Sequence, residues 1–170
     1  MLTEPVLTNV GIVPAAPEFH VGLRRLTRAH DVPLVIDETH TISTGPRGYT
    51  GECGLDPDFL VLGKSIAGGI PVAVWGASEE MARKIWSVLP HFELGQEINH
   101  FGFGGTLAGS ALQIRAIRAT LEHAMTEDNY RRMIDLAKAF ETGVTDVLAS
   151  HGLRWHVTRI GARVEYLFLP

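Results

Sequence analysis

The chain has 170 residues, enough for one domain with a substantial core, and its 45% hydrophobic and 20% charged residues are typical of a soluble globular protein. A net charge of −4 gives no attraction toward nucleic acid or an anionic membrane, and no apolar run approaches the roughly 20 residues that span a bilayer. The single cysteine, Cys53, cannot form an internal disulfide, and the N-terminus lacks a secretory signal, so we expect a cytoplasmic protein that binds neither nucleic acid nor membrane.

The first half of the chain alternates between predicted strands and helices. Two continuous apolar runs have the pattern of strands that helices cover on both faces. The segment between them is rich in Gly, Pro, Ser and Asp, which is typical of a loop. In chain order we expect a short strand and its exit over 5–13, a helix from Pro17 to about residue 30, a strand over 33–38, a loop over 41–58, and strands over 59–63 and 71–77.

The second half is mainly helical in pattern. Ser78 is expected to cap a helix with acidic residues in its first turn. A glycine-rich loop over 91–105 precedes two helices, over 106–124 and from Thr126 to about residue 150, and the tail over 154–170 predicts two strands. The apolar side chains expected to face inward are Leu107, Ala111, Ile114, Ile117 and Leu121 on the first of these helices, and Met133, Phe140, Val144 and Val147 on the second.

These elements predict an α/β fold with a mainly parallel sheet and flanking helices, followed by the start of a smaller α+β region. We place the division between residues 1–145 and 146–170. Strand-like runs lie close to both ends of the chain, where domains usually have exposed polar segments. We therefore expect the chain to be part of a larger architecture.

Two polar residues stand at the predicted carboxyl ends of strands, where open α/β sheets bind ligands. Asp37 follows one apolar run and Lys64 follows the next. One interpretation is a structural ion pair. The other is a catalytic pair, because a buried lysine is more often the free amine that attacks carbonyls, and pyridoxal phosphate enzymes need such a lysine and an acid for the ring nitrogen.

Several motifs occur in an order that resembles a known family. They are VIDETHT at 35–41, LDPDFLVLGK at 55–64, GGIP at 68–71 and GGT at 104–106. Together they resemble the class-III, fold type I, pyridoxal-phosphate aminotransferases, and the N-terminal residues are most similar to the glutamate-1-semialdehyde aminomutase branch. The resemblance implies that the chain is a segment of the family's large domain, well under half of a complete member.

The resemblance also implies a role for three residues. Lys64 would form a Schiff base with the pyridoxal 5'-phosphate aldehyde and then move a proton between the substrate and cofactor carbons. Asp37 would pair with the pyridinium nitrogen. Thr106, expected at a helix start, would bind the cofactor phosphate across a dimer interface.

Three further residues match cofactor-binding positions less closely. Thr39 stands where the family usually has a valine packed on the cofactor ring, and its methyl group can still pack there. His40 follows it and is a candidate contact of the phenolic oxygen. Asn9 matches a position near the cofactor in the aminomutase branch.

The implied function is transfer of an amino group between a small-molecule amino donor and a carbonyl acceptor, or between neighbouring carbons of one molecule, in a homodimer. No residue spacing predicts a metal site. The alternative is a truncated, non-catalytic remnant or a docking partner of a full-length aminotransferase, because the family's phosphate-binding loop and ring-stacking aromatic cannot be located. A P-loop at Gly63–Ser65 is not indicated, because Asp58 occupies the place of the motif's first glycine.

Overall fold

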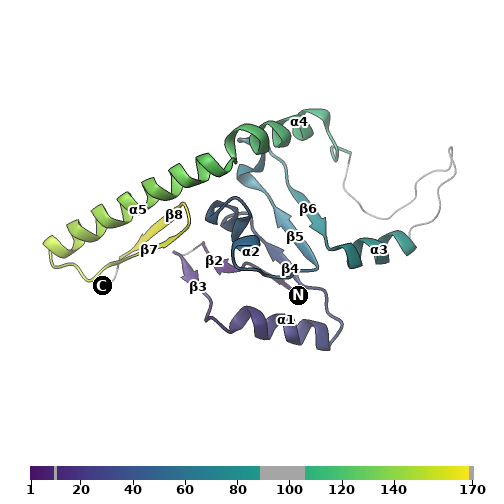
Figure 1. The fold of residues 1–170 in the computed structure, drawn as a ribbon, viewed down its shortest axis with the longest axis horizontal. Helices are drawn as coiled ribbons and strands as arrows, with labels where there is room; N and C mark the ends of the chain where they lie inside the picture. The colour runs from purple at the N-terminus through teal and green to yellow at the C-terminus, as the bar shows by residue number, and fades with distance from the viewer. Residues whose placement is uncertain (10, 89–105, 169–170) are drawn as a thin grey trace.

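A computed structural model describes residues 1–9, 11–88 and 106–168 (Figure 1). Its largest sheet has four strands in the order β1-β4-β5-β6, and β1, β4 and β5 are parallel whereas β6 runs antiparallel to β5. The fold is therefore α/β, as predicted, with a mixed sheet. The bounds of the strands are Leu2–Thr3 for β1, Val35–Asp37 for β4, Phe59–Leu62 for β5 and Val74–Ala77 for β6.

Helices flank this sheet in the way that the alternation of the sequence predicts. Helix α1, Phe19–Ala29, leads into β4, and α3, Glu79–Val88, follows β6. Two short 3₁₀ turns, η1 at Thr41–Thr44 and η2 at Lys64–Ala67, follow β4 and β5. The buried core gathers apolar side chains from the sheet and the turns beside it: Val6, Ile12, Leu34, Ile36, Ile66 and Ala67.

The short strand expected within residues 5–13 is present as β2, at Val6–Leu7. Its exit was not predicted to pair, but it leads into a second short strand, β3 at Val13–Pro14, which is antiparallel to β2 and forms a separate hairpin with it. Gly11 in the turn has a φ of +88°, a conformation that favours glycine, and the chain reverses there. The expected loop over 41–58 contains both η1 and a one-turn helix, α2, at Gly48–Glu52.

The C-terminal part is built on one long helix. Helix α5, Glu127–Ser150, begins where Thr126 Oγ1 accepts a hydrogen bond of 3.3 Å from the Asn129 amide, so the predicted cap is confirmed. The predicted strand pair is also confirmed, as β7 at His156–Ile160 and β8 at Arg163–Leu167. This hairpin packs along α5 (Figure 1).

The helix expected over residues 106–124 begins later than predicted. Helix α4 spans Ala111–Ala119 and continues as a π-helical turn, η3, at Thr120–Ala124. Gly109 has a φ of +71° and therefore cannot continue a right-handed helix toward the N-terminus. Thr106 consequently lies in a turn before α4 rather than at a helix start. The predicted loop over 91–105 falls outside the described residues.

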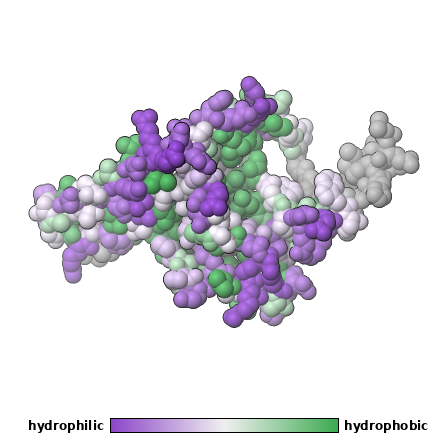
Figure 2. Space-filling model, in the orientation of Figure 1, coloured by the Kyte–Doolittle hydropathy of each residue, from purple (hydrophilic) through white to green (hydrophobic). Residues whose placement is uncertain are grey.

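Several apolar side chains expected to face inward are exposed in the described part of the chain. Ile114 on α4 and Phe140 on α5 keep 55% and 50% of their surface accessible, and Leu107, Leu121, Met133 and Val147 are exposed as well. The buried residues of α5 are Tyr130, Ala137 and Leu148. Figure 2 shows a band of hydrophobic surface below α4. The expectation that these side chains face inward is therefore wrong for the described residues, because the apolar faces of α4 and α5 are only partly covered and Leu107 lies before α4 begins.

Candidate active site

The candidate site lies where two neighbouring parallel strands end. In the register of the sheet, Asp37 at the end of β4 pairs with Val61 in β5, and Lys64 follows three residues later at the start of η2. The amide of Glu38 continues the ladder with a hydrogen bond of 2.9 Å to the Val61 carbonyl. The carboxylate and the amine therefore emerge at the same edge of the sheet, the edge at which α/β folds bind ligands.

The carboxylate of Asp37 is oriented by its own turn. Its Oδ1 accepts a hydrogen bond of 2.8 Å from the Thr39 amide, an Asx-type contact that holds the side chain against the chain leaving β4. The Thr39 side chain lies against Gly63, where an added Cβ would come within 3.4 Å of Thr39 Oγ1. The segments on either side of the sheet edge thus approach each other closely at Thr39 and Gly63.

Lys64 has an unusual backbone conformation. Its φ is +50°, in the left-handed region that residues with a Cβ adopt at a cost of about 1–2 kcal/mol, so its surroundings must favour that conformation. The side chain is exposed, so the sequence-based expectation of a buried lysine is wrong. The reason is positional: the residue stands outside the sheet, past its carboxyl edge, while the neighbouring Ile66 and Ala67 fill the core.

The amine of Lys64 contacts the imidazole of His40, Nζ to Nε2. On its other side the ring contacts Thr8, with 2.7 Å between Nδ1 and Oγ1, and the Thr8 hydroxyl donates to Glu4 Oε2 at 2.8 Å. Burial lowers the pKa of His40, the positive charges of Lys64 and Arg163 lower it further, and Glu4 and Asp37 oppose the shift. His40 is therefore held as the neutral imidazole at neutral pH.

The structure brings five of the six residues chosen from the sequence to this edge or its immediate border. Asn9 is connected to the site indirectly, because its Nδ2 donates to Glu4 Oε1 at 3.3 Å. Thr106 does not join them: in the described segments, no hydrogen bond or ion pair links it to the other candidates. It is exposed in the turn before α4.

Sequence reasoning missed Glu4, Thr8 and Arg163. Arg163, at the start of β8, donates to the Thr8 carbonyl at 3.0 Å and forms an ion pair with Glu165. Thr8 is buried, although a threonine in a strand-like run carries no sequence signal for a polar contact. No local pattern could have found these residues, because the contacts that connect them to the site, Thr8 with His40 and Arg163 with Thr8, join residues that are 32 and 155 positions apart.

Glu38, which follows Asp37 in the chain, is a buried carboxylate that holds the segment after β4 in place. Its two oxygens accept hydrogen bonds of 2.7 Å each from the amides of Tyr49 and Thr50, at the start of α2. Gly48 leaves room for this contact, since an added Cβ there would lie 2.4 Å from Glu38 Oε2. Glu38 therefore ties the chain next to Asp37 to the segment that was expected to be a loop.

Replacing Glu38 with glutamine should lower the free energy of unfolding by about 1–3 kcal/mol. A glutamine has one acceptor oxygen, so its NH₂ group would face one of the two amide donors of α2. Urea titration followed by circular dichroism measures the change. Glu52→Gln is the control, since Glu52 makes only a long ion pair of 3.5 Å with the exposed Arg47. Equal stability of the two variants would contradict the supporting role of Glu38.

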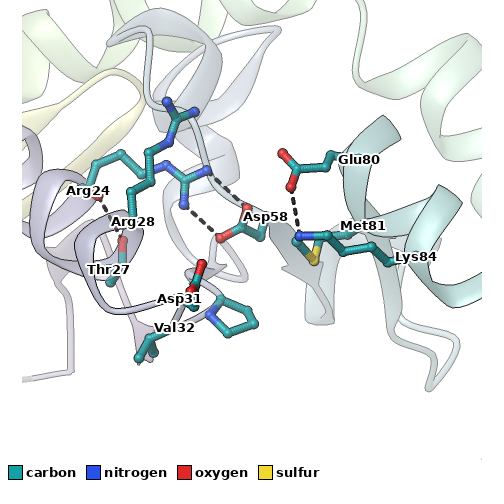
Figure 3. Close-up of a pocket in the computed structure, with 10 residues that line it drawn as sticks. Arg24, Thr27, Arg28, Asp31, Val32, Asp58, Glu80, Met81 and Lys84 are labelled. Carbon is teal, nitrogen blue, oxygen red and sulfur yellow. Dashed lines mark hydrogen bonds and ion pairs between the residues drawn. The ribbon is translucent and has the colours of Figure 1, made fainter.

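Away from this edge, a cleft of about 360 Å³ is lined by residues of α1, α3 and the segments before β4 and β5 (Figure 3). Its charged side chains are largely paired: Arg24 with Asp58 at 2.7 Å, Lys84 with Glu80 at 2.7 Å, and Arg28 with the nearby Asp56 at 2.5 Å. Asp58 stands directly before β5, at the opposite end of that strand from Lys64. The cleft is therefore an ion-pair network at the amino ends of the strands, where α/β folds do not usually place their chemistry.

Two classes of site find no support in the described residues. In residues 1–9, 11–88 and 106–168, no group of three His, Cys, Asp or Glu side chains could hold a metal ion. No helix within those same ranges is long and apolar enough to cross a bilayer.

Comparison with known proteins yields one consistent result. The profile of the family Aminotransferase class-III matches residues 1–163. Curated relatives include glutamate-1-semialdehyde 2,1-aminomutases of Salinibacter ruber, 33% identical, and Thermomicrobium roseum, 34% identical, each aligned over 99% of this chain and 37% of its own length. The chain thus spans a little over a third of the curated relatives it matches.

Solved structures agree with the sequence matches. Two crystal structures of a glutamate-1-semialdehyde-aminomutase from Pseudomonas aeruginosa PAO1, one in complex with PMP, are 67% identical and superpose with a TM-score of 0.93 over 99% of this chain and 37% of theirs. An omega-transaminase from Sphaerobacter thermophilus is 28% identical, with a TM-score of 0.79 over 97% of this chain and 36% of its own.

Proposed function

Because this chain belongs to the class-III aminotransferase family, we propose that it takes part in amino-group transfer that depends on pyridoxal 5'-phosphate, with Lys64 as the residue that captures the cofactor aldehyde. One observation carries the proposal. Lys64 and Asp37, an amine and a carboxylate, follow neighbouring parallel strands at one edge of the sheet. An ion pair alone does not account for the arrangement, since Lys64 contacts His40 and Asp37 contacts the Thr39 amide.

The residues present fit the cofactor chemically. The primary amine of Lys64 matches the aldehyde, and the carboxylate of Asp37 matches the protonated ring nitrogen. Thr39 and His40 line the same edge and would border the ring, with Asn9 next to them through Glu4. When bound, the cofactor ring supplies an electron sink for the carbon that carries the transferred amino group. The chain's own part is to hold the amine, the carboxylate and the imidazole in place.

The reaction class follows from the relatives. The 67% identity to a glutamate-1-semialdehyde-aminomutase supports a transfer between neighbouring carbons of one molecule, and the likeness to an omega-transaminase supports transfer between an amino donor and a carbonyl acceptor. We propose the 2,1-aminomutase type first. A homodimer, in which Thr106 reaches the partner's cofactor phosphate, and a cytoplasmic location are part of the same proposal. So is the division of the chain into residues 1–145 and 146–170.

A second candidate function is a non-catalytic remnant or a docking partner of a full-length aminotransferase. The exposed apolar faces of α4 and α5 favour an assembled context, because Ile114 and Phe140 would be covered by further polypeptide. In this case Lys64 would remain without a cofactor.

Chemical trapping separates the two functions. The chain is mixed with pyridoxal phosphate, reduced with borohydride and digested, and the peptides are analysed by mass spectrometry. We expect one phosphopyridoxyl group on the peptide that contains Lys64. A folded chain that carries no adduct, or that carries it equally on all three of its lysines, would contradict capture at this site and favour the remnant.

A further inference from the structure

Four side chains from three distant segments form one continuous chain of contacts at the sheet edge. Glu4 and Thr8 flank β2, His40 precedes η1, and Lys64 begins η2. The contacts run from Glu4 Oε2 to Thr8 Oγ1, from Thr8 Oγ1 to His40 Nδ1, and from His40 Nε2 to Lys64 Nζ. Both ring nitrogens of His40 are therefore engaged, each by a group of different hydrogen-bonding character.

The direction of each hydrogen bond follows from counting protons. An ionised carboxylate only accepts, so the single hydroxyl proton of Thr8 points at Glu4. Thr8 Oγ1 can then offer only a lone pair to His40, and Nδ1 must carry the ring proton. A neutral imidazole has one N–H, so Nε2 is left as an acceptor. Lys64 Nζ, which as an ammonium only donates, lies at that nitrogen.

We infer that Glu4 and Thr8 are positioning residues that set the tautomer of His40, so that its Nε2 lone pair accepts from Lys64 and holds the amine at the carboxyl edge of the sheet. Only one part of the inference rests on the proposed function, namely that the amine of Lys64 is held in order to react with the cofactor. The tautomer itself is a property of the chain without cofactor. Thr8 is 2% exposed, and its buried hydroxyl makes both contacts within ordinary hydrogen-bond distance.

The surroundings of His40 favour the same state. The charged groups that act on the ring are Lys64 and Arg163, which disfavour a second ring proton, and Glu4 and Asp37, which favour one. Burial of the ring acts in the same direction as Lys64 and Arg163, so the pKa of His40 is lowered. Arg163 also donates to the Thr8 carbonyl at 3.0 Å, which fixes the backbone that carries the hydroxyl.

The test is a measurement of the His40 tautomer by two-bond ¹H–¹⁵N correlation in the chain labelled with ¹⁵N-histidine, above about pH 7.5, where histidine is neutral. Signals are assigned by their loss in His40→Gln. We expect the Nδ1–H form in the wild-type chain and also in Lys64→Met, which lacks the donor at Nε2. If Lys64→Met switches to the Nε2–H form, the lysine sets the tautomer and the inference is overturned.

A matched pair of variants tests Thr8 in the Lys64→Met background. Thr8→Ser keeps the hydroxyl and should keep the Nδ1–H form, whereas the isosteric Thr8→Val should lose that preference. With Lys64 present, Thr8→Val should slow the reaction of Lys64 with pyridoxal phosphate roughly two- to tenfold relative to Thr8→Ser, as expected for loss of one hydrogen bond. Identical tautomers and identical rates in the two variants would overturn the inference.

Should Thr8→Val fail to fold, Glu4→Gln replaces it in the Lys64→Met background. The glutamine NH₂ can donate to Thr8 Oγ1, which frees the hydroxyl proton to point at His40 Nδ1, so the Nε2–H form should appear. An unchanged tautomer would overturn the inference. Absence of the phosphopyridoxyl adduct in the wild-type chain would contradict the proposed function. The tautomer measurements would still test the role of Glu4 and Thr8.

Discussion

Replacing Lys64 with alanine should abolish covalent capture of pyridoxal phosphate. The chain has three lysines, and only Lys64 lies at the carboxyl edge of the sheet. Its Nζ contacts the neutral imidazole of His40. The measurement is the yield of the reduced adduct by intact-mass spectrometry. Because the side chain is exposed, the alanine variant should remain folded by circular dichroism.

The other two lysines provide matched controls for this loss. Lys84 donates to Glu80 at 2.7 Å, and this hydrogen bond, with the charge of Glu80, raises the pKa of Lys84 and keeps it a poor nucleophile. Lys138 is paired with Asp135 at 3.1 Å. Lys84→Ala and Lys138→Ala should therefore leave the adduct yield unchanged. An adduct that persists in Lys64→Ala, or that disappears in either control, would contradict the assignment of Lys64.

Replacing Asp58 with alanine should lower the free energy of unfolding by about 3–5 kcal/mol. Arg24 donates to both oxygens of this carboxylate, at 2.7 and 3.0 Å (Figure 3). The Leu34 amide also donates to it, at 2.7 Å. The Asp58 side chain is 8% exposed and that of Arg24 is 18% exposed. Removal of the carboxylate leaves the Leu34 amide without its partner and leaves Arg24 with the longer contact of 3.5 Å between its Nε and the exposed Asp56, which is costlier than losing a surface ion pair.

Asp56→Ala is the control, two residues away. Asp56 is 61% exposed and pairs with Arg28 at 2.5 Å and with Arg24 Nε at 3.5 Å, so its loss leaves the Arg24–Asp58 pair in place and should cost less than about 1 kcal/mol. Urea unfolding at about pH 7, with a common slope for all variants, measures both changes. A loss for Asp58→Ala as small as that for Asp56→Ala would show that the buried pair contributes no more than a surface one.

The same pair predicts how stability depends on pH. The hydrogen bond from Arg24 lowers the pKa of Asp58 below its ordinary value of 3.8, the Leu34 amide and nearby positive charges add to the shift, and burial opposes it. The folded state therefore binds fewer protons than the unfolded state in acid. The stabilisation is present above about pH 4 and is lost as pH falls through the folded pKa. Wild type and Asp58→Ala should accordingly converge in stability in acid.

The sequence was sufficient for the elements that depend on local pattern. The apolar runs at 33–38 and 59–63 are β4 and β5, and the order of strand ends alone predicted that Asp37 and Lys64 share one edge of the sheet. The reason is geometric, because parallel neighbours finish on the same side. The cap at Thr126 and the C-terminal strand pair also follow from local residue preference.

Segments that depend on distant partners were predicted poorly. The exit of the N-terminal strand turns at Gly11 into a second strand, β3, and the side chain of Leu167 from β8 lies against Gly11, where an added Cβ would come within 2.9 Å of it. Helix α2 appeared to be a loop because its sequence has poor helix formers, and its start is stabilised by Glu38 from another element. In both cases a contact over a long sequence separation overrides local preference.

The sequence by itself determined the family, the α/β layering and the two residues at the heart of the proposed site. Only the tertiary structure decided that Lys64 is exposed, that His40 lies between it and the Glu4–Thr8 pair, and that Asp58 is neutralised by Arg24. Motifs and hydrophobic periodicity reflect the conformational preferences of residues that are close together in the sequence. Hydrogen-bond partners that are 24 to 34 residues apart depend instead on how the finished elements pack, which no local pattern encodes.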